Sequence, residues 1–220
     1  MKSFACLILA LALATPALAQ QRGQFGGRGQ GGVASLIRNE SVQKELKMEK
    51  EQTDKAAEAV TKIREKHNDE FTKLRDLSQE ERRTKTAELT KVISDETLAA
   101  LETILKPDQV KRLKQIDLQQ AGVAAFTRAD VEKALKLNDE QKGKVKAIAE
   151  ESSTKMRELR GGTGGAGRTR GADQEKVTAL RKEMMNKGLE VLNDEQKGTW
   201  KTLVGEAFTV VPAPPRKKDN

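Results

Sequence analysis

The feature that most constrains this chain is a helical sequence unit that is written twice. Residues 39–52 and 128–141 align at a shift of 89 positions, and Val42, Leu46 and Gln52 are among the residues that recur. Residues 104–113 and 191–200 align at a shift of 87. The pattern L-x-x-(D/E)-Q occurs in both parts of the second unit, at residues 137–141 and 192–196. Most of the protein is therefore expected to be two copies of one fold.

The N-terminus has the composition of a secretory signal. Lys2 precedes an apolar stretch over residues 4–14, and Ala17 and Ala19 form a small-residue cleavage site. The stretch is shorter than the roughly 20 residues that a membrane-spanning helix needs. We therefore expect cleavage after Ala19, no stable membrane insertion, and a periplasmic or secreted protein. Cleavage also removes Cys6, the only cysteine, so no disulfide can stabilise the mature chain.

The composition favours an all-α fold. Charged residues make up 34% of the chain and aromatic residues 3%, and tyrosine is absent. Because strands of a sandwich or barrel are enriched in aromatic and β-branched residues, this composition argues against both folds. The formal net charge is +8, but the basic and acidic residues are interspersed. That pattern is typical of a solvated helical surface and leaves a modest preference for acidic partners.

The expected organisation follows from shifts in composition. Residues 1–19 are the signal, 20–35 a flexible leader rich in Gly, Gln and Arg, 36–120 the first repeat, 121–208 the second, and 209–220 a disordered tail rich in proline and basic residues. The leader has two Arg-Gly steps, too few to indicate nucleic-acid binding. The second repeat contains a Gly-rich hairpin loop over residues 161–173. It lacks the Lys-Ser/Thr ending of a phosphate-binding loop and no strand leads into it, so a linker is favoured.

Apolar side chains that recur every three or four residues lie on one face of a helix. This spacing predicts a long amphipathic helix in each repeat, with that face directed toward the core. In the first repeat they are Ala56, Val60, Ile63, His67, Phe71 and Leu74; in the second they are Val145, Ile148, Ser152, Met156 and Leu159. Each stripe needs a partner, and the next helix in the same repeat supplies one. We therefore predict a tandem pair of helical-hairpin units with no sheet. The copies either pack together or extend as a rod.

The repeated pentapeptides predict helix starts. In residues 137–141, Asn138 is the expected N-cap, acidic residues follow it, and Gln141 can reach back to the cap amide. Residues 192–196 repeat this device, and in residues 105–109 a proline takes the first helical position. Residues 48–52 read as a degenerate copy without a good cap, and Thr127 as a further cap. The candidate helix-corner residues are Leu105, Gln109, Leu137, Asn138, Gln141, Leu192, Asn193 and Gln196.

These motifs resemble those of the CpxP/Spy periplasmic proteins, in which paired L-T-x-x-Q motifs are spaced by long amphipathic helices after a signal peptide. Leu137, Gln141, Leu192 and Gln196 match that pattern best, with Leu105 and Gln109 next. The resemblance implies a bent helical hairpin and chaperone or envelope-stress-adaptor activity. Two features depart from the pattern: this chain holds two units in one polypeptide, in place of the family's dimer, and its second hairpin is Gly-rich.

No constellation of residues predicts catalysis, a metal site or a cofactor. The single histidine of the sequence, His67, lies on an apolar stripe and is expected to be a hydrogen-bonded residue at the edge of the core. Trp200 takes the position of Leu113 in the other copy, which favours a place in the core. Serines lie in no strand-turn-helix elbow, and no glycosidase-like carboxylate pair stands out.

The resulting hypothesis is an exported, non-enzymatic helical protein that holds unfolded or partly folded envelope proteins, or acts as a stress adaptor. The alternative is a structural protein that assembles with itself as a homo-oligomer, or that coats an anionic envelope polymer. One continuous exposed apolar patch would favour the first reading, and complete burial between the copies would favour the second.

Overall fold

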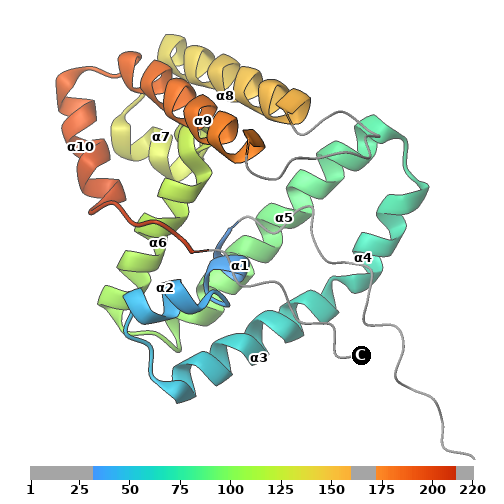
Figure 1. Cartoon of the computed structure of the whole chain (residues 1–220). Helices are drawn as coiled ribbons and strands as arrows, with labels where there is room; N and C mark the ends of the chain where they lie inside the picture. Colours follow the sequence, from blue (N-terminus) through green and yellow to red (C-terminus); the bar gives the residue numbers. More distant parts are fainter. Residues whose placement is uncertain (1–31, 160–171, 212–220) are drawn as a thin grey trace, which may run out of the picture.

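The computed structural model describes residues 32–159 and 172–211. These residues form helices and connecting turns with no strand, as the composition predicts (Figure 1). The signal, residues 20–31 of the leader, most of the Gly-rich loop and residues 212–220 lie outside the described residues. The elements are α1 (Val33–Leu36), α2 (Glu40–Glu45), α3 (Lys50–Lys66), α4 (Asn68–Lys73), η1 (Leu74–Asp76), α5 (Gln79–Glu102), α6 (Pro107–Ala121), η2 (Gly122–Thr127), α7 (Ala129–Leu135), α8 (Asp139–Leu159), α9 (Ala172–Glu190) and α10 (Asp194–Val204).

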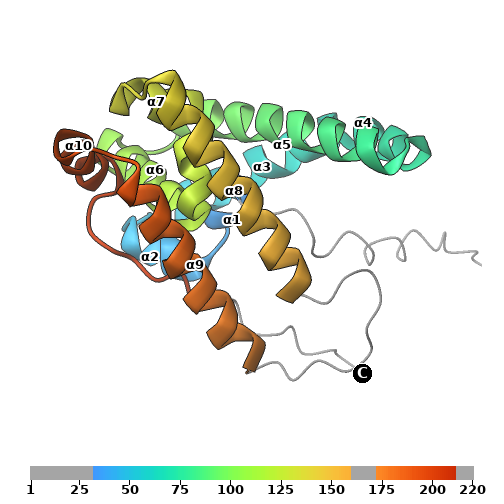
Figure 2. The same cartoon turned by 90° about the horizontal axis from the view of Figure 1, so that it is seen from above.

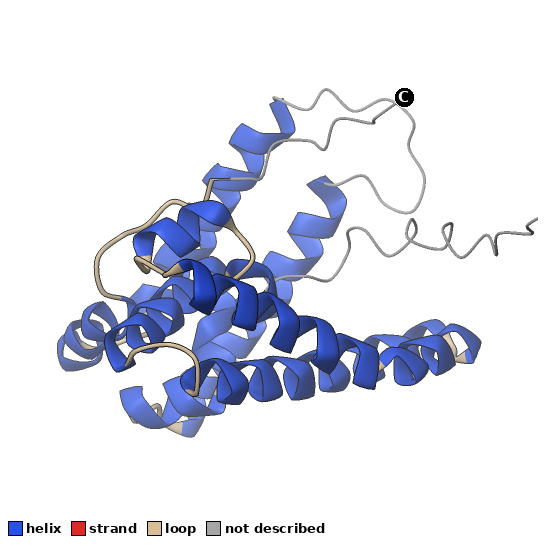
Figure 3. Ribbon diagram, turned by 90° about the horizontal axis from the view of Figure 1, so that it is seen from below, coloured by secondary structure: helices blue, strands red, loops and turns tan. Residues whose placement is uncertain are grey.

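The main helices of the two repeats follow the same order, while α4 and η1 have no counterpart among the described residues of the second. In each, a short helix (α2, α7) leads into a long hairpin, α3–α5 or α8–α9, which a further helix (α6, α10) follows. The correspondence extends upstream, because α1 and η2 are also 89 positions apart and precede α2 and α7. Figures 2 and 3 show the two hairpins diverging from the side of the molecule where α6 and α10 lie. We call that side the base.

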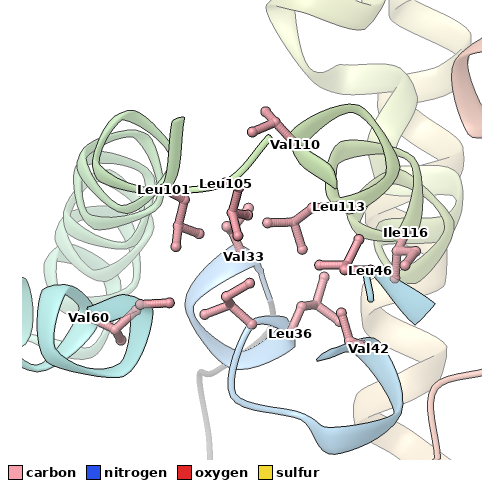
Figure 4. Close-up of a cluster of buried hydrophobic side chains, with 12 residues drawn as sticks. Val33, Leu36, Val42, Leu46, Val60, Leu101, Leu105, Val110, Leu113 and Ile116 are labelled. Atoms are coloured by element: carbon pink, nitrogen blue, oxygen red, sulfur yellow. The ribbon is translucent and has the colours of Figure 1, made fainter. Parts of the chain in front are cut away.

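Each repeat has its own hydrophobic core near the base. The first core is drawn in Figure 4, where α1 sits between the hairpin and α6. It consists of Val33, Leu36, Ile37, Val42, Leu46, Ala56, Val60, Leu101, Leu105, Val110, Leu113 and Ile116. The periodic stripe of α3 enters this core only through Ala56 and Val60, while Ile63, Phe71 and Leu74 remain half-buried. The predicted stripe therefore faces inward, but it is covered less well toward the far end of the hairpin.

The second core contains the tryptophan. It consists of Leu118, Val123, Ala125, Phe126, Val131, Leu135, Leu137, Val145, Leu180, Met184, Leu192 and Trp200. The rings of Phe126 and Trp200 lie 4.4 Å apart between centroids at 49°, a favourable tilted geometry. Trp200 is 5% exposed, so its predicted place in the core is confirmed.

The two repeats pack on each other and do not extend as a rod. Helix α6 supplies Ile116 to the first core and Leu118 to the second, and it also packs against α10. At this crossing the buried Asp117 accepts a hydrogen bond from Arg128 at 2.6 Å. Because α6 belongs to both cores, its register sets the position of one repeat relative to the other.

The segment that follows α10, residues 205–211, returns to the first repeat. Gln119 joins it by two hydrogen bonds, donating to the carbonyl of Glu206 and accepting from the amide of Phe208, and it also donates to the carbonyl of Val204 at the end of α10. Phe208 and Val210 pack on the first core, and Asn39 donates to the carbonyl of Val211 at 2.8 Å. The tail, residues 209–220, was expected to be disordered and solvated. Its first residues are irregular, but they are attached to the first repeat.

Two further expectations require correction. Residues 33–35 were assigned to the leader, yet they form α1 and place Val33 in the core at 3% exposure. Thr127 was expected to cap α7, but the N-cap is Arg128, and the Thr127 hydroxyl donates to the carbonyl of Ala124. In both cases the residues belong to the short element that precedes α2 or α7, which the local sequence did not reveal.

A substitution at Gly188 on α9 tests how closely the second core is packed. A Cβ at this position would lie 2.8 Å from Phe126 and 2.9 Å from Val123. We expect Gly188→Ala to destabilise the fold by about 1–3 kcal/mol through overpacking. The matched control is Gly143→Ala in α8, where nothing lies within 4 Å; it should stabilise by about 0.5–1 kcal/mol. Urea unfolding followed by circular dichroism measures both, and equal effects would contradict the packing of Phe126 on α9.

Candidate functional site

The residues that end the pentapeptides meet in pairs. In the second repeat, Gln141 at the start of α8 and Gln196 at the start of α10 exchange two hydrogen bonds through their side-chain amides. Gln141 Nε2 donates to Gln196 Oε1 at 2.8 Å, and Gln196 Nε2 donates to Gln141 Oε1 at 3.0 Å. We call this reciprocal contact a glutamine pair.

The first repeat has the same pair between Gln52 at the start of α3 and Gln109 at the start of α6. Gln52 Nε2 donates to Gln109 Oε1 at 2.9 Å, and Gln109 Nε2 donates to Gln52 Oε1 at 3.2 Å. Gln52 was not among the candidate residues, because its pentapeptide begins with Met48 in place of leucine and was judged to lack a good cap. The sequence signal that could have identified Gln52 is its alignment with Gln141 at a shift of 89 positions.

Each glutamine also satisfies the ends of the helices around it. The Oε1 atoms of Gln52, Gln109, Gln141 and Gln196 accept from the backbone amides of Glu49, Lys106, Asn138 and Asn193 at 3.1, 2.8, 3.2 and 2.9 Å. Their second amide hydrogens reach the carbonyls of Ile104, Leu46, Val191 and Leu135. Both donors and the acceptor of every amide are therefore used, which a side chain removed from water requires.

The remaining motif residues position these glutamines. Asn138 and Asn193 accept from the amides of Gln141 and Gln196 at 2.8 Å, which gives the predicted capping boxes. Leu105, Leu137 and Leu192 precede the caps and are buried in the two cores. The start at residues 48–52 was expected to lack a good cap, but Gln52 forms half of a capping box there with the amide of Glu49.

A left-handed residue sets the chain direction before the first corner of each repeat. Lys47 and Lys136, 89 positions apart, have φ angles of +50° and +52°. They end α2 and α7 with the hydrogen bonds of a Schellman motif, from Met48 to Gln43 and from Leu137 to Glu132. This turn brings the carbonyls of Leu46 and Leu135 toward the glutamine pairs.

Removing one member of a pair should be costly. We expect Gln196→Met to lower the free energy of unfolding by about 1–3 kcal/mol, because the amide oxygen of Gln141 and the carbonyl of Leu135 lose a donor. Gln120→Met on the exposed side of α6 is the control and should change stability by less than about 0.5 kcal/mol. Chemical denaturation of both variants makes the comparison. Equal small effects would mean that the pair does not stabilise the base.

His67 lies at the junction of α3 and α4 and joins the two sides of the first hairpin. Its side chain is 7% exposed; Nδ1 lies 2.5 Å from a Glu70 carboxylate oxygen and Nε2 lies 3.1 Å from one of Glu96 on α5. Lys66 also contacts Glu96, at 2.7 Å. Hydrogen bonds to Glu70 and then to Glu96 raise the pKa of His67 above its usual value. The prediction of a hydrogen-bonded residue at the edge of the core is confirmed.

His67 should make stability depend on pH. Its folded-state pKa is raised, so its contribution is complete below the unfolded value of about 6.5 and is lost as pH rises through the folded value. We expect the wild type to lose stability from acid toward alkaline pH in this range. His67→Met, which copies Met156 of the second repeat, should flatten the profile. Unfolding free energies at several pH values test this, and parallel profiles for the two proteins would contradict it.

Within the described ranges, no cluster of three or more His, Cys, Asp or Glu side chains is arranged to hold a metal ion. Among the same residues no helix is both long enough and apolar enough to cross a bilayer. The surface is dominated by ion pairs between exposed side chains of the same or neighbouring helices, such as Lys55 with Glu51 and Lys187 with Glu151. Exposed pairs of this kind contribute little to stability and keep the helices hydrated.

Comparison with known proteins gives one match. Residues 124–192 match the model of the LTXXQ motif family, the family of CpxP/Spy-like periplasmic proteins. This segment runs from η2 to Leu192 and includes Gln141, so the predicted resemblance is confirmed there. The family is a non-enzymatic helical one. Searches of the curated proteins and of the solved structures found no match.

Proposed function

We propose that this protein is exported and holds unfolded or partly folded segments of other envelope proteins without chemical catalysis. The observation that carries the proposal is the shape of the two hairpins. Each is fixed at the base by a glutamine pair and a packed core, while the apolar stripes farther along remain half-buried. The similarity of residues 124–192 to a periplasmic-type family supports the same conclusion.

The distribution of apolar surface defines how such holding would work. Among the described residues, the exposed large hydrophobic side chains are Val92 at 45%, on α5, and Val211 at 60%, in the segment that follows α10. No continuous apolar patch is therefore available on the outside of this part of the molecule. The inner stripes are neither exposed nor fully buried: they include Ile63, Phe71 and Ile93 in the first hairpin and Ile148, Met156 and Leu159 in the second.

Contacts of this kind are weak one by one. Because each side chain is already partly buried, only a fraction of its apolar area is left to contact a client. Burying that area contributes roughly 25 cal/mol of binding free energy per Å². The positive net charge adds a long-range attraction to acidic clients, which salt screens. Binding should consequently be broad, fast and stronger at low ionic strength.

A prevention-of-aggregation assay on the mature protein tests this function. We expect it to suppress light scattering by a denatured acidic client at low salt, and to do so much less in about 1 M salt, where the Debye length is about 3 Å. The double variant Phe71→Ser/Met156→Ser should weaken protection, because it changes one residue on each inner stripe. Val92→Ser on the outer face of α5 is the control. The absence of protection at equimolar or higher ratio in low salt would remove the proposed function.

The second candidate is a scaffold that assembles with itself or coats an anionic envelope polymer. The near-complete burial of apolar side chains at the base, in two closed cores, favours it. It predicts stable oligomers or co-sedimentation with cell-wall fractions, and no protection of clients. Size-exclusion chromatography with light scattering, run beside the aggregation assay, separates the two candidates.

A further inference from the structure

The segment that follows α10 lies on the first repeat as a bound peptide would. We call residues 205–211 the strap; it crosses α6 and reaches the start of α2 (Figure 1). Its side chains alternate, because Phe208 and Val210 are half-buried against the first core while the neighbours of each are exposed. This alternation is that of an extended chain with one face on a surface.

The first repeat holds the strap by its backbone. The Gln119 side chain donates to the carbonyl of Glu206 at 2.7 Å and accepts from the amide of Phe208 at 2.8 Å. These two backbone groups lie on one edge of an extended chain, where a neighbouring strand would bind them. The carboxamide of Gln119 therefore takes the place of a peptide group of such a strand.

The remaining polar contacts are of the same kind. Arg112 donates to the carbonyl of Glu206 at 2.9 Å. At the other end of the strap, Asn39 donates to the carbonyl of Val211 at 2.8 Å, and the Ser41 hydroxyl accepts from its amide at 3.1 Å. These bonds use backbone groups that nearly every residue offers in the same form. Recognition of this kind selects an extended conformation, and the apolar side chains supply the preference for sequence.

Two apolar side chains anchor the strap. Phe208 and Val210 pack on the first core, and the guanidinium carbon of Arg112 lies 6.0 Å from the centre of the Phe208 ring, within reach of a cation–π contact. The fully buried members of this core all come from the segment between α1 and α6. Release of the strap would therefore leave the core closed, which makes it a low-cost local opening.

The repeated fold does not require the strap. At the shift of 87 that aligns residues 191–200 with 104–113, Gly205 corresponds to Leu118, where α6 continues. Gly205 instead ends α10 with a φ of +61°, a conformation that glycine adopts without strain. The turn onto α6 is thus a feature of the second repeat alone.

We propose that the strap occupies a peptide-binding site of the first repeat, and that its release admits an extended segment of another protein with apolar side chains at alternate positions. This assignment rests on the proposed holding function and names the kind of client segment. Such a segment presents the same backbone edge and the same two anchors as the strap. While bound, the strap is an internal competitor, with the millimolar effective concentration of a tethered ligand.

The test is calorimetric titration of the mature full-length protein with the blocked peptide Glu-Ala-Phe-Thr-Val-Val, the sequence of residues 206–211. The released variant Phe208→Ser/Val210→Ser keeps the whole chain and removes both anchors. We expect it to bind the peptide at least about tenfold more tightly than the wild type, because the internal competitor is weakened. Thr209→Ser/Val211→Ser changes exposed strap positions and is the control; its affinity should stay within about threefold of the wild type.

Further titrations of the released variant examine how the segment is recognised. Glu-Ala-Leu-Thr-Ile-Val should bind within about fivefold of the strap sequence, and Glu-Ala-Ser-Thr-Ser-Val at least about tenfold more weakly, because it has no anchors. Adding Gln119→Leu should weaken binding by at least about fivefold, since two backbone groups of the peptide lose their partner. Gln120→Leu on the exposed side of α6 is the matched control. Circular dichroism melting shows whether each variant is folded.

Equal binding by the wild type and the released variant would overturn the assignment, and so would binding of the strap sequence alone. Self-association of the released variant without peptide binding would assign the site to a second copy and also overturn it. Protection of clients by the wild type, with no peptide bound by the released variant, would refute the strap site and leave the holding function standing. Peptide binding with no protection by either protein would have the opposite meaning.

Discussion

The structure depends on an amide-to-amide contact at the base of each repeat, between one buried and one half-buried glutamine. A glutamine side chain removed from water is unfavourable unless all of its hydrogen-bonding groups are paired. Here each amide is paired with its partner glutamine, with the start of its own helix and with the end of another. Four chain segments consequently meet at one point at the base of the hairpin.

The motif therefore has a larger role than capping. A capping box alone stabilises a helix by about 1 kcal/mol and acts locally. In this protein the capping glutamine uses both amide hydrogens and its second lone pair across the fold, so the start of α8 and the start of α10 are specified together. At three of the four corners a buried leucine before the cap directs the corner into the core. Local helix signals and tertiary contacts are thus carried by the same five residues.

Much of the fold could be predicted from the sequence because its signals are local. The helical stripes, the caps at Asn138 and Asn193, and the core position of Trp200 all follow from spacing within a few turns or from the internal repeat. The glutamine pairs could not be predicted, since their members are 55 or 57 residues apart and meet only when the hairpin closes. The contact between His67 and Glu96, and the return of residues 205–211 to the first repeat, were missed for the same reason.

The presence of both repeats in one polypeptide has a consequence for symmetry. In a homodimer every substitution appears on both subunits, so a new side chain must be tolerated twice and the two faces stay identical. A covalently joined pair is free of that restriction. Here the shared α6 and the paired amides keep the two halves alike in backbone, while Arg38, Arg64 and His67 have no chemical counterpart at positions 127, 153 and 156. One half can thus specialise while the other preserves the architecture, which gives the molecule two unequal faces.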